Sequence, residues 1–171
     1  MNFNDVKIGS IVKIAGINWI VLDKHFDEVL CLTKDFISQC EFDRKTNNYA
    51  KSAIRQYLNG QFLSEISSKV GENKIVRTYI DLISDDGLDD YGYVDDKIGL
   101  LTVDMYRRYN RIIEKYKVNN WWWLSTAYST PHRSYSACVR CVIFDGSLFI
   151  SGCSGNNVGV RPFCVFKSSI F

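Results

Sequence analysis

Residues 136–151 read SACVRCVIFDGSLFIS, and this stretch decides the class of fold. Two short runs rich in Val, Ile and Phe flank Asp145-Gly146, a dipeptide that favours the tight turn of a β-hairpin. We therefore predict strands at 136–144 and 147–151. A third extended piece follows at 159–166, so the C-terminal part of the chain reads as a run of short strands.

Upstream of this run the spacing of hydrophobic residues first indicates strands and then a helix. Residues 10–14, 18–23 and 28–33 read as a small antiparallel meander separated by short polar or glycine-containing links. A helical pattern then begins near Tyr49, and Asn59-Gly60 supplies its predicted stop. Its apolar face holds Ile54, Tyr57, Leu58 and Phe62.

A second helix is predicted after Thr102 and Asp104, either of which suits its N-cap. One face of this helix is apolar and the opposite face is basic. The apolar face holds Met105, Tyr109, Ile112, Ile113 and Tyr116, and the basic face holds Arg107, Arg108, Arg111 and Lys115. Helices followed by short strands predict an α+β fold.

Length and composition predict one domain covering residues 1–171. With 171 residues, of which 46% are hydrophobic, the chain can bury one substantial core. A net charge of +2 gives no general attraction to nucleic acid or membrane. Residues 1–11 lack the pattern of a secretory signal, and no apolar run reaches the roughly 18 residues of a membrane span. We expect cytoplasmic synthesis, no nucleic-acid partner and no membrane insertion; later display on a phage particle or cell surface stays open.

The six cysteines are interpreted as free, partly buried thiols. Cys138 and Cys141 form a C-x-x-C, which invites a zinc or redox interpretation. Two residues three apart on a strand point to opposite faces, however, and Cys153 and Cys164 are too far apart in sequence to form a second close pair. Metal or redox chemistry remains the alternative.

Residues 81–97 are strongly acidic and contain seven aspartates and two glycines. The favoured interpretation is a solvated surface loop. Calcium bound between Asp85 and Asp96 is the alternative, since hard cations are held by clustered carboxylates. The spacing does not fit an EF-hand, and no glutamate stands where a bidentate ligand is needed.

Residues 124–166 contain no Lys, Glu, Gln, Met or Trp, although the remainder of the chain uses all five. The stretch is rich in Ser, Cys, Tyr, Phe, Asn, Arg and Gly instead. Binding surfaces of antibodies use a similar mixture of rigid aromatic and small adaptable side chains. The composition therefore indicates a surface that binds another molecule.

A set of motifs in a fixed order resembles a bacterial and phage domain family with a C-type-lectin-like fold. The motifs cover nearly the whole chain: residues 17–23 around Trp19, residues 52–62, Trp122-Trp123-Leu124-Ser125, Asp145-Gly146-Ser147-Leu148 and Gly159-Val160-Arg161-Pro162. This family is similar to the variable proteins of diversity-generating retroelements, which share their fold with formylglycine-generating enzymes.

The resemblance implies a C-type-lectin-like fold of short antiparallel strands with two main helices, and a variable region at 124–166. In such systems an error-prone reverse transcriptase converts AAY codons to NNY near the 3′ end of the gene. NNY codons cannot encode Lys, Glu, Gln, Met or Trp, the five types missing from 124–166. The implied function is non-enzymatic binding of a protein or glycan ligand, with no cofactor.

Alternation along the predicted strands divides this region into inward and outward residues. The inward candidates are Ala137, Val139, Val142, Leu148 and Ile150. The ligand-binding candidates are Tyr128, Ser129, His132, Arg133, Ser134, Tyr135, Arg140, Phe149, Ser151, Asn156 and Asn157. Tyr128, Tyr135, Arg140 and Phe149 are large enough to be anchors. Core positions for Tyr135 and Phe149, and a plain turn for the two asparagines, are the alternatives.

Two further motifs are assigned to the framework. The resemblance implies that Arg161 is held by an internal hydrogen-bond network, and that Trp121, Trp122 and Trp123 belong to the core, not to a sugar-stacking platform. Two other functions are weighed and disfavoured. A calcium-dependent lectin lacks its Glu-Pro-Asn, Gln-Pro-Asp or Trp-Asn-Asp triplet here, and an enzyme related to formylglycine-generating enzymes lacks a matching cysteine motif.

Overall fold

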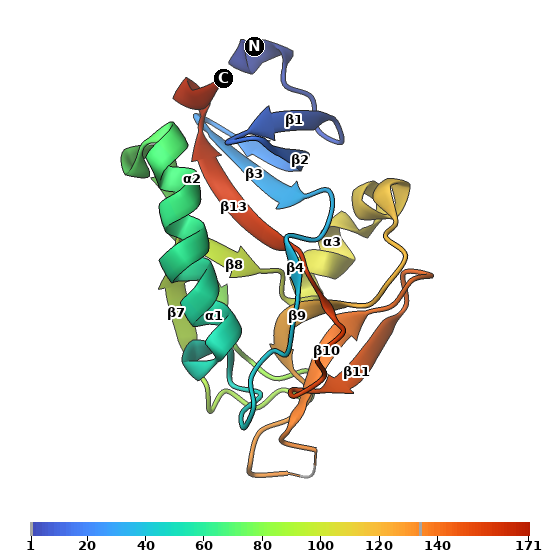
Figure 1. Ribbon diagram of the computed structural model, residues 1–171. Helices are drawn as coiled ribbons and strands as arrows, with labels where there is room; N and C mark the ends of the chain where they lie inside the picture. Colours follow the sequence, from blue (N-terminus) through green and yellow to red (C-terminus); the bar gives the residue numbers. More distant parts are fainter. Residues whose placement is uncertain (1, 134) are drawn as a thin grey trace.

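Mostly antiparallel sheets and two helical segments make up the structure, a computed structural model that describes residues 2–133 and 135–171 (Figure 1). The first sheet, sheet A, comprises β1 (Ile11–Ile14), β2 (Ile17–His25), β3 (Glu28–Thr33), β13 (Pro162–Lys167), β5 (Ile75–Val76) and β8 (Ile98–Leu100). The second, sheet B, comprises β11 (Leu148–Gly152), β10 (Cys138–Val142), β9 (Trp122–Ala127), β12 (Gly159–Val160) and β4 (Ser38–Gln39). A separate two-stranded ribbon pairs β6 (Thr78–Asp81) with β7 (Tyr93–Asp96). The predicted α+β class is confirmed.

The helices are α1 (Ala53–Tyr57), α2 (Leu63–Val70) and α3 (Val103–Ile113). A π-helical turn, Leu58–Phe62, joins α1 to α2 without a break. Short 3₁₀ turns occur at Phe3–Asp5, Tyr49–Lys51, Glu72–Lys74, Glu114–Tyr116 and Ser168–Ile170. None of the helices in the described part of the chain is long and apolar enough to cross a membrane.

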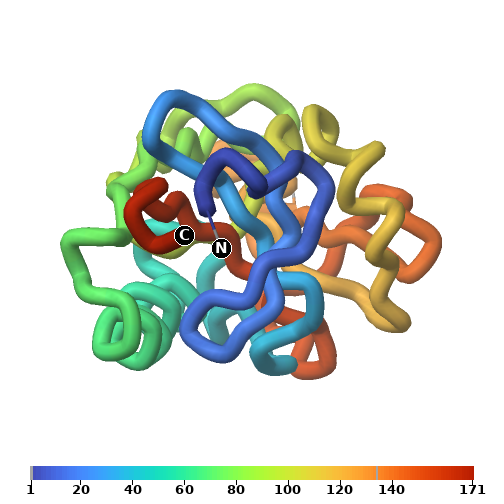
Figure 2. Tube along the Cα trace, turned by 90° about the horizontal axis from the view of Figure 1, so that it is seen from above, coloured from blue at the N-terminus to red at the C-terminus, as the bar shows by residue number. Residues whose placement is uncertain are grey.

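The two ends of the chain meet in sheet A. The predicted N-terminal meander is confirmed as β1, β2 and β3, and the last strand, β13, pairs antiparallel with β3. Figure 2 shows the N- and C-termini beside each other on this side of the molecule. Sheet A therefore joins the first strands of the chain to its last strand. The strands β9, β10 and β11, which lie between them in the sequence, belong to sheet B (Figure 1).

The predicted helix stop at Asn59-Gly60 is wrong. The Asn59 side chain hydrogen-bonds both the carbonyl of Ile98, at 2.8 Å, and the amide of the same residue, at 3.3 Å. Leu58 and Phe62 are buried on either side, and the wider π turn accommodates the extra residue. Burial thus outweighs the cost of a mid-helix glycine, and the helix ends at Gly71, whose φ is +90°.

The second predicted helix is confirmed, and so are the core positions of Trp122 and Trp123, whereas Trp121 is only half-buried. Thr102 caps α3 by accepting the amide of Met105 at 3.1 Å. Trp122 and Trp123 are both buried although they point to opposite faces of β9, because this central strand of sheet B is covered on both sides. The Trp123 indole donates to the carbonyl of Cys40 at 2.9 Å.

Arg161 lies in the interior, as predicted. Its Nε donates to the carbonyl of Thr33 at 3.1 Å, and its guanidinium carbon lies 4.9 Å from the Trp122 ring centroid. Burial lowers the pKa of Arg161 to about 10. The residue therefore connects the end of β3 to sheet B and takes no part in an exposed site.

Candidate functional site

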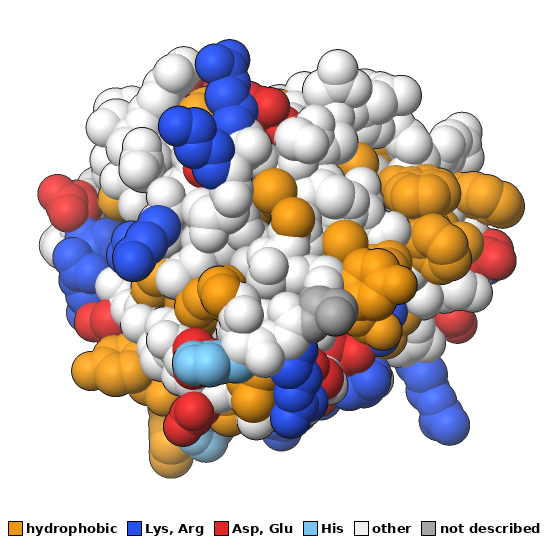
Figure 3. Space-filling model, turned by 90° about the horizontal axis from the view of Figure 1, so that it is seen from below, with side chains coloured by type: hydrophobic (Ala, Val, Ile, Leu, Met, Phe, Trp, Pro, Cys, Tyr) orange, Lys and Arg blue, Asp and Glu red, His pale blue; other side chains and the backbone are white. Residues whose placement is uncertain are grey.

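The loop of residues 128–137 joins β9 to β10 and projects from the end of sheet B (Figure 1). Its base is closed by the backbone, because the Tyr128 amide donates to the carbonyl of Cys138 at 2.9 Å. Figure 3 views the molecule from this end and shows hydrophobic, basic, acidic and histidine side chains side by side. Four of the predicted ligand-binding residues are exposed or half-buried on this loop: Tyr128, His132, Arg133 and Tyr135.

Three of the predicted anchors form one cluster, which we call the Tyr128 cluster: Tyr128, Tyr135 and Arg140. The two tyrosine rings meet edge to face with centroids 5.9 Å apart. The Arg140 guanidinium lies 5.1 Å from the centroid of the Tyr128 ring, within the range of a cation–π contact. Tyr128 is half-buried at the base of the loop, and Tyr135 is 66% exposed.

Tyr135 combines exposure with a costly backbone conformation. Its φ is +66°, in the left-handed region that bulky L-residues rarely adopt. A residue held in that region costs of order 1–3 kcal/mol and is often found at a binding site. The alternative of a core position for Tyr135 is therefore wrong, because its ring is mostly exposed.

The acidic segment packs against this loop and holds it. Asp86 accepts the Ser129 hydroxyl at 2.8 Å and the Arg133 guanidinium at 3.1 Å. Asp90 accepts the Thr130 hydroxyl and lies 2.8 Å from Nδ1 of His132. Hydrogen bonds lower the pKa of both carboxyls: chiefly that of Ser84 for Asp86, and that of Thr130 for Asp90.

These contacts correct two predictions. Ser129 is not an outward residue: it is 1% exposed and its hydroxyl is directed at Asp86. Residues 81–97 are not simply a solvated loop either, since they contain the β6–β7 ribbon and anchor residues 129–133. Among the described residues no group of three or more His, Cys, Asp or Glu is arranged to hold a metal ion.

Arg140 lies deeper than an outward position predicts. Its Nη2 donates to Asp85, and its side chain is 19% exposed. Its Nε is buried without a hydrogen-bond partner among the described residues. Arg140 thus supports the Tyr128 ring from beneath and presents only its edge at the surface.

Strand register divides the remaining candidates between two faces of sheet B. Arg140 pairs with Ile150, whereas Cys141 pairs with Phe149 and Val139 with Ser151. Directly paired residues point to the same face, so Phe149 and Ser151 lie on the face opposite Arg140. One continuous binding face holding all three is therefore excluded.

Phe149 belongs to a second patch on that opposite face. It is 48% exposed and packs edge to face against Trp121, with centroids 5.4 Å apart. The carbonyl of Asn157 accepts the side-chain amide of Asn120, which precedes Trp121. Asn156 and Asn157 are both exposed, while Ser151 is half-buried. We call Trp121, Phe149 and Asn157 the Phe149 patch.

The predicted inward residues are only partly inward. Val139 and Val142 are buried, Leu148 and Ile150 are half-buried, and Ala137 is exposed. Val139 and Val142 are three residues apart on β10, so they point to opposite faces of the sheet, and both are buried. Alternation with a single buried face therefore cannot place both of them. The predicted candidate Ser134 lies outside the described residues.

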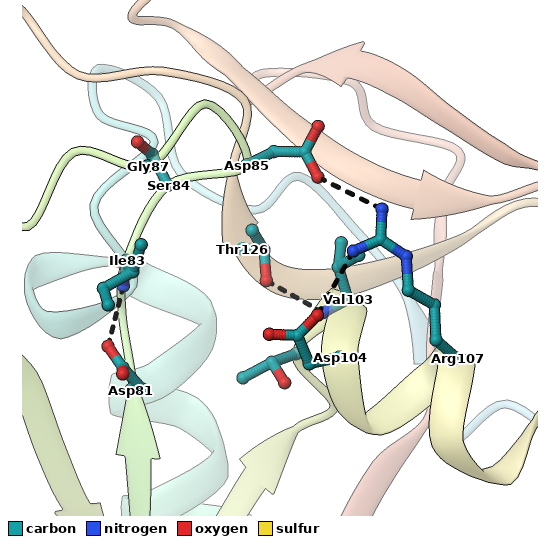
Figure 4. Close-up of a pocket in the computed structure, with 10 residues that line it drawn as sticks. Asp81, Ile83, Ser84, Asp85, Gly87, Val103, Asp104, Arg107 and Thr126 are labelled. Carbon is teal, nitrogen blue, oxygen red and sulfur yellow. Dashed lines mark hydrogen bonds and ion pairs between the residues drawn. The ribbon is translucent and has the colours of Figure 1, made fainter.

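A cavity of about 240 Å³ opens beside the acidic segment at the start of α3 (Figure 4). Asp85 and Asp104 face Arg107 across it, at 3.9 and 3.2 Å. Sequence reasoning missed that Asp85 pairs with both Arg107 and Arg140. The signal was present, because a basic face on the helix and an acidic segment next to it in the sequence are complementary in charge.

Burial disfavours the thiolate form of Cys141 and Cys153. All six are free thiols in the structure. Burial raises the pKa of Cys141 to about 12, and that of Cys153 is also raised, chiefly by burial. A thiol is nucleophilic only as the thiolate, so these groups are protonated and unreactive near neutral pH.

Comparison with known protein families gives a match to part of the chain. A family model described as a domain of unknown function (DUF6273) matches residues 26–104, less than half of the chain. The match runs from the β2–β3 turn to the start of α3 and includes the acidic segment, but not the Tyr128 cluster. No curated protein and no solved structure matches the chain.

Proposed function

We propose that this chain is a non-enzymatic binding protein with a C-type-lectin-like framework, and that it is a variable protein of a diversity-generating retroelement. Residues in 124–166 would bind a protein or glycan ligand. The observation that carries the proposal is Tyr135, a large aromatic side chain that is mostly exposed and occupies a strained backbone position on a projecting loop.

The way the loop is anchored supports a division between fixed and exchangeable residues. Ser129 and Thr130 are buried and donate to Asp86 and Asp90, which lie outside the proposed variable region. The side chains of His132 and Arg133 are 73% and 55% exposed. Exposed ion pairs contribute little to stability, so these two residues can change without release of the loop.

Two separate patches also suit a binding protein. The Tyr128 cluster and the Phe149 patch each offer exposed aromatic area beside polar groups, which is the composition of binding hot spots. A ligand that contacts the 128–137 loop would be bound chiefly by the Tyr128 cluster. We therefore assign primary recognition to Tyr128, His132, Arg133 and Tyr135, and a secondary role to Phe149.

Alleles of this gene from one locus test the proposal directly. We expect codon differences to concentrate at His132, Arg133 and Tyr135 and to spare Ser129 and Thr130. A neighbouring reverse-transcriptase gene with a near-copy of the 124–166 codons would agree. Differences spread evenly along the chain would contradict diversification.

A library experiment tests the physical basis without knowledge of the ligand. Randomisation of the exposed residues His132, Arg133 and Tyr135 with NNY codons should leave most members folded, because exposed substitutions change stability by about 0.5 kcal/mol or less. A matched library at the buried residues Ser129, Thr130 and Val139 should yield few folded members. Protease resistance of displayed clones is the measurement. Equal folded fractions in the two libraries would refute the division.

A further inference from the structure

Two tyrosine rings stack on the outer face of the β6–β7 ribbon, which lies apart from both patches on sheet B. Tyr79 and Tyr93 are 62% and 61% exposed. Their ring centroids are 4.8 Å apart and their planes are inclined by 27°. Each ring therefore covers one side of the other and leaves its outer side open to solvent.

The register of the ribbon places two carboxylates beside these rings. Tyr79 pairs with Asp95, and Tyr93 pairs with Asp81. These four residues are exposed and alternate along the strands with the buried Ile80 and Val94. The outer face of the ribbon therefore consists of two aromatic rings flanked by two aspartates.

The two aspartates of this face have no ion-pair partner among the described residues. Asp85, Asp86, Asp90 and Asp96 each form an ion pair with an arginine or histidine. Asp81 and Asp95 form none with any residue in 2–133 or 135–171. Arg77 donates to the backbone carbonyl of Asp95 at 2.7 Å and not to its carboxylate. Both carboxylates of this face therefore remain available to a cation from outside the protein.

We propose that this face binds a basic polypeptide segment, with arginine side chains stacked on Tyr79 and Tyr93 and paired with Asp81 and Asp95. A planar guanidinium stacks on an aromatic face and also donates two parallel hydrogen bonds to a carboxylate. The exposed rings and the uncompensated carboxylates supply both contacts within one small area. This surface is independent of the binding function proposed for residues 124–166.

The stacked rings also stabilise the ribbon itself, as cross-strand aromatic pairs do. The test therefore changes the carboxylates and leaves the rings in place. Binding of a fluorescein-labelled peptide of alternating Arg and Gly is measured by fluorescence anisotropy for the wild type and for Asp81→Asn/Asp95→Asn. Asp5→Asn/Asp27→Asn is the matched control, since both of its sites are exposed and the change in net charge is the same.

We expect the Asp81→Asn/Asp95→Asn variant to bind roughly tenfold more weakly, with an unchanged melting temperature, because it loses two ion pairs. The control variant should bind like the wild type, and a peptide with Gln in place of Arg should not bind. Replacement of Arg by Lys should weaken binding, because lysine lacks the planar group. Equal binding by the two double variants, or by the Gln peptide, would overturn the proposal.

Discussion

Among single residues, Tyr135 gives the sharpest prediction, because its bulky side chain is unfavourable in the left-handed backbone conformation that it adopts. At φ +66°, asparagine is tolerated far better than tyrosine. We expect Tyr135→Asn to leave the free energy of unfolding within about 0.5 kcal/mol of the wild type, since relief of strain offsets the lost contact with Tyr128. Urea unfolding measures this. A loss above about 1.5 kcal/mol would show that the ring belongs to the framework.

Gly146 supplies the matched control for that variant. Its φ is +94°, and it forms the turn between β10 and β11. Gly146→Ala places a Cβ in a similarly unfavourable region, so it should destabilise by about 1 kcal/mol or more. Unchanged stability in Tyr135→Asn together with lower stability in Gly146→Ala would confirm that backbone strain, and not position in a loop, determines the change in the free energy of unfolding.

Trp123, in contrast to Tyr135, is a residue of the hydrophobic core. It is fully buried, packs edge to face on Phe42 with centroids 5.7 Å apart, and donates to the Cys40 carbonyl. Trp123→Ala should cost about 3–5 kcal/mol, measured by chemical denaturation. Trp121→Ala, at a half-buried position, should cost less than half as much. A stable Trp123→Ala protein would be inconsistent with the core described above.

At the scale of secondary-structure elements, the helical segment from α1 to α2 gives a prediction about its glycines. Gly60 lies in its π turn with no positive φ, and a Cβ added there would meet nothing within 4 Å. Gly60→Ala should therefore stabilise the protein by about 0.5–1 kcal/mol. Gly71→Ala should destabilise it, because φ is +90° and the new Cβ would lie 3.0 Å from the Asn73 side chain. Thermal unfolding of both variants tests the pair; destabilisation by Gly60→Ala would show that the turn requires glycine.

The contact between the acidic segment and the 128–137 loop predicts a pH dependence. Asp86 and Asp90 have folded-state pKa values below the ordinary 3.8. Depressed carboxyl pKa values mean that their stabilisation is complete above the ordinary value and is lost as pH falls through the folded-state values. We expect carboxyl NMR titrations of both residues with midpoints below 3.8, and loss of the ordered loop at still lower pH. Midpoints above 3.8 would mean that the hydrogen bonds do not persist in solution.

At the scale of the whole molecule, local signals in the sequence predicted the elements better than their partners. The meander, the Thr102 cap and the Asp145-Gly146 turn depend on neighbours in sequence, and all three are found. The helix stop at Asn59-Gly60 failed because Ile98, distant in sequence, hydrogen-bonds Asn59. Contacts of long sequence separation carry no local signature, and they override intrinsic propensity.

The candidate site was predictable to the same extent. Aromatic and basic residues in 128–140 could be selected by type, and Tyr128, Tyr135 and Arg140 do lie together. Alternation could not place Phe149, since β11 is an edge strand whose residues are partly exposed on both faces. The burial of Ser129 depends on Asp86, which lies 43 residues away and has no signal near Ser129.

The connection of the helical segment to the ribbon supplies a prediction for the whole molecule. Arg55 in α1 binds Asp96 at the end of β7 through two hydrogen bonds of 2.7 and 2.8 Å, and the Asp96 side chain is 4% exposed. Arg55→Met leaves that carboxylate buried without its cation, so we expect a loss of about 2–3 kcal/mol, below the range for a fully buried pair because Arg55 is 31% exposed. Arg55→Met/Asp96→Leu removes both charges and should recover part of the loss. Chemical denaturation of the two single variants and the double variant gives the coupling energy, and additive losses would mean that the ion pair does not join the two elements.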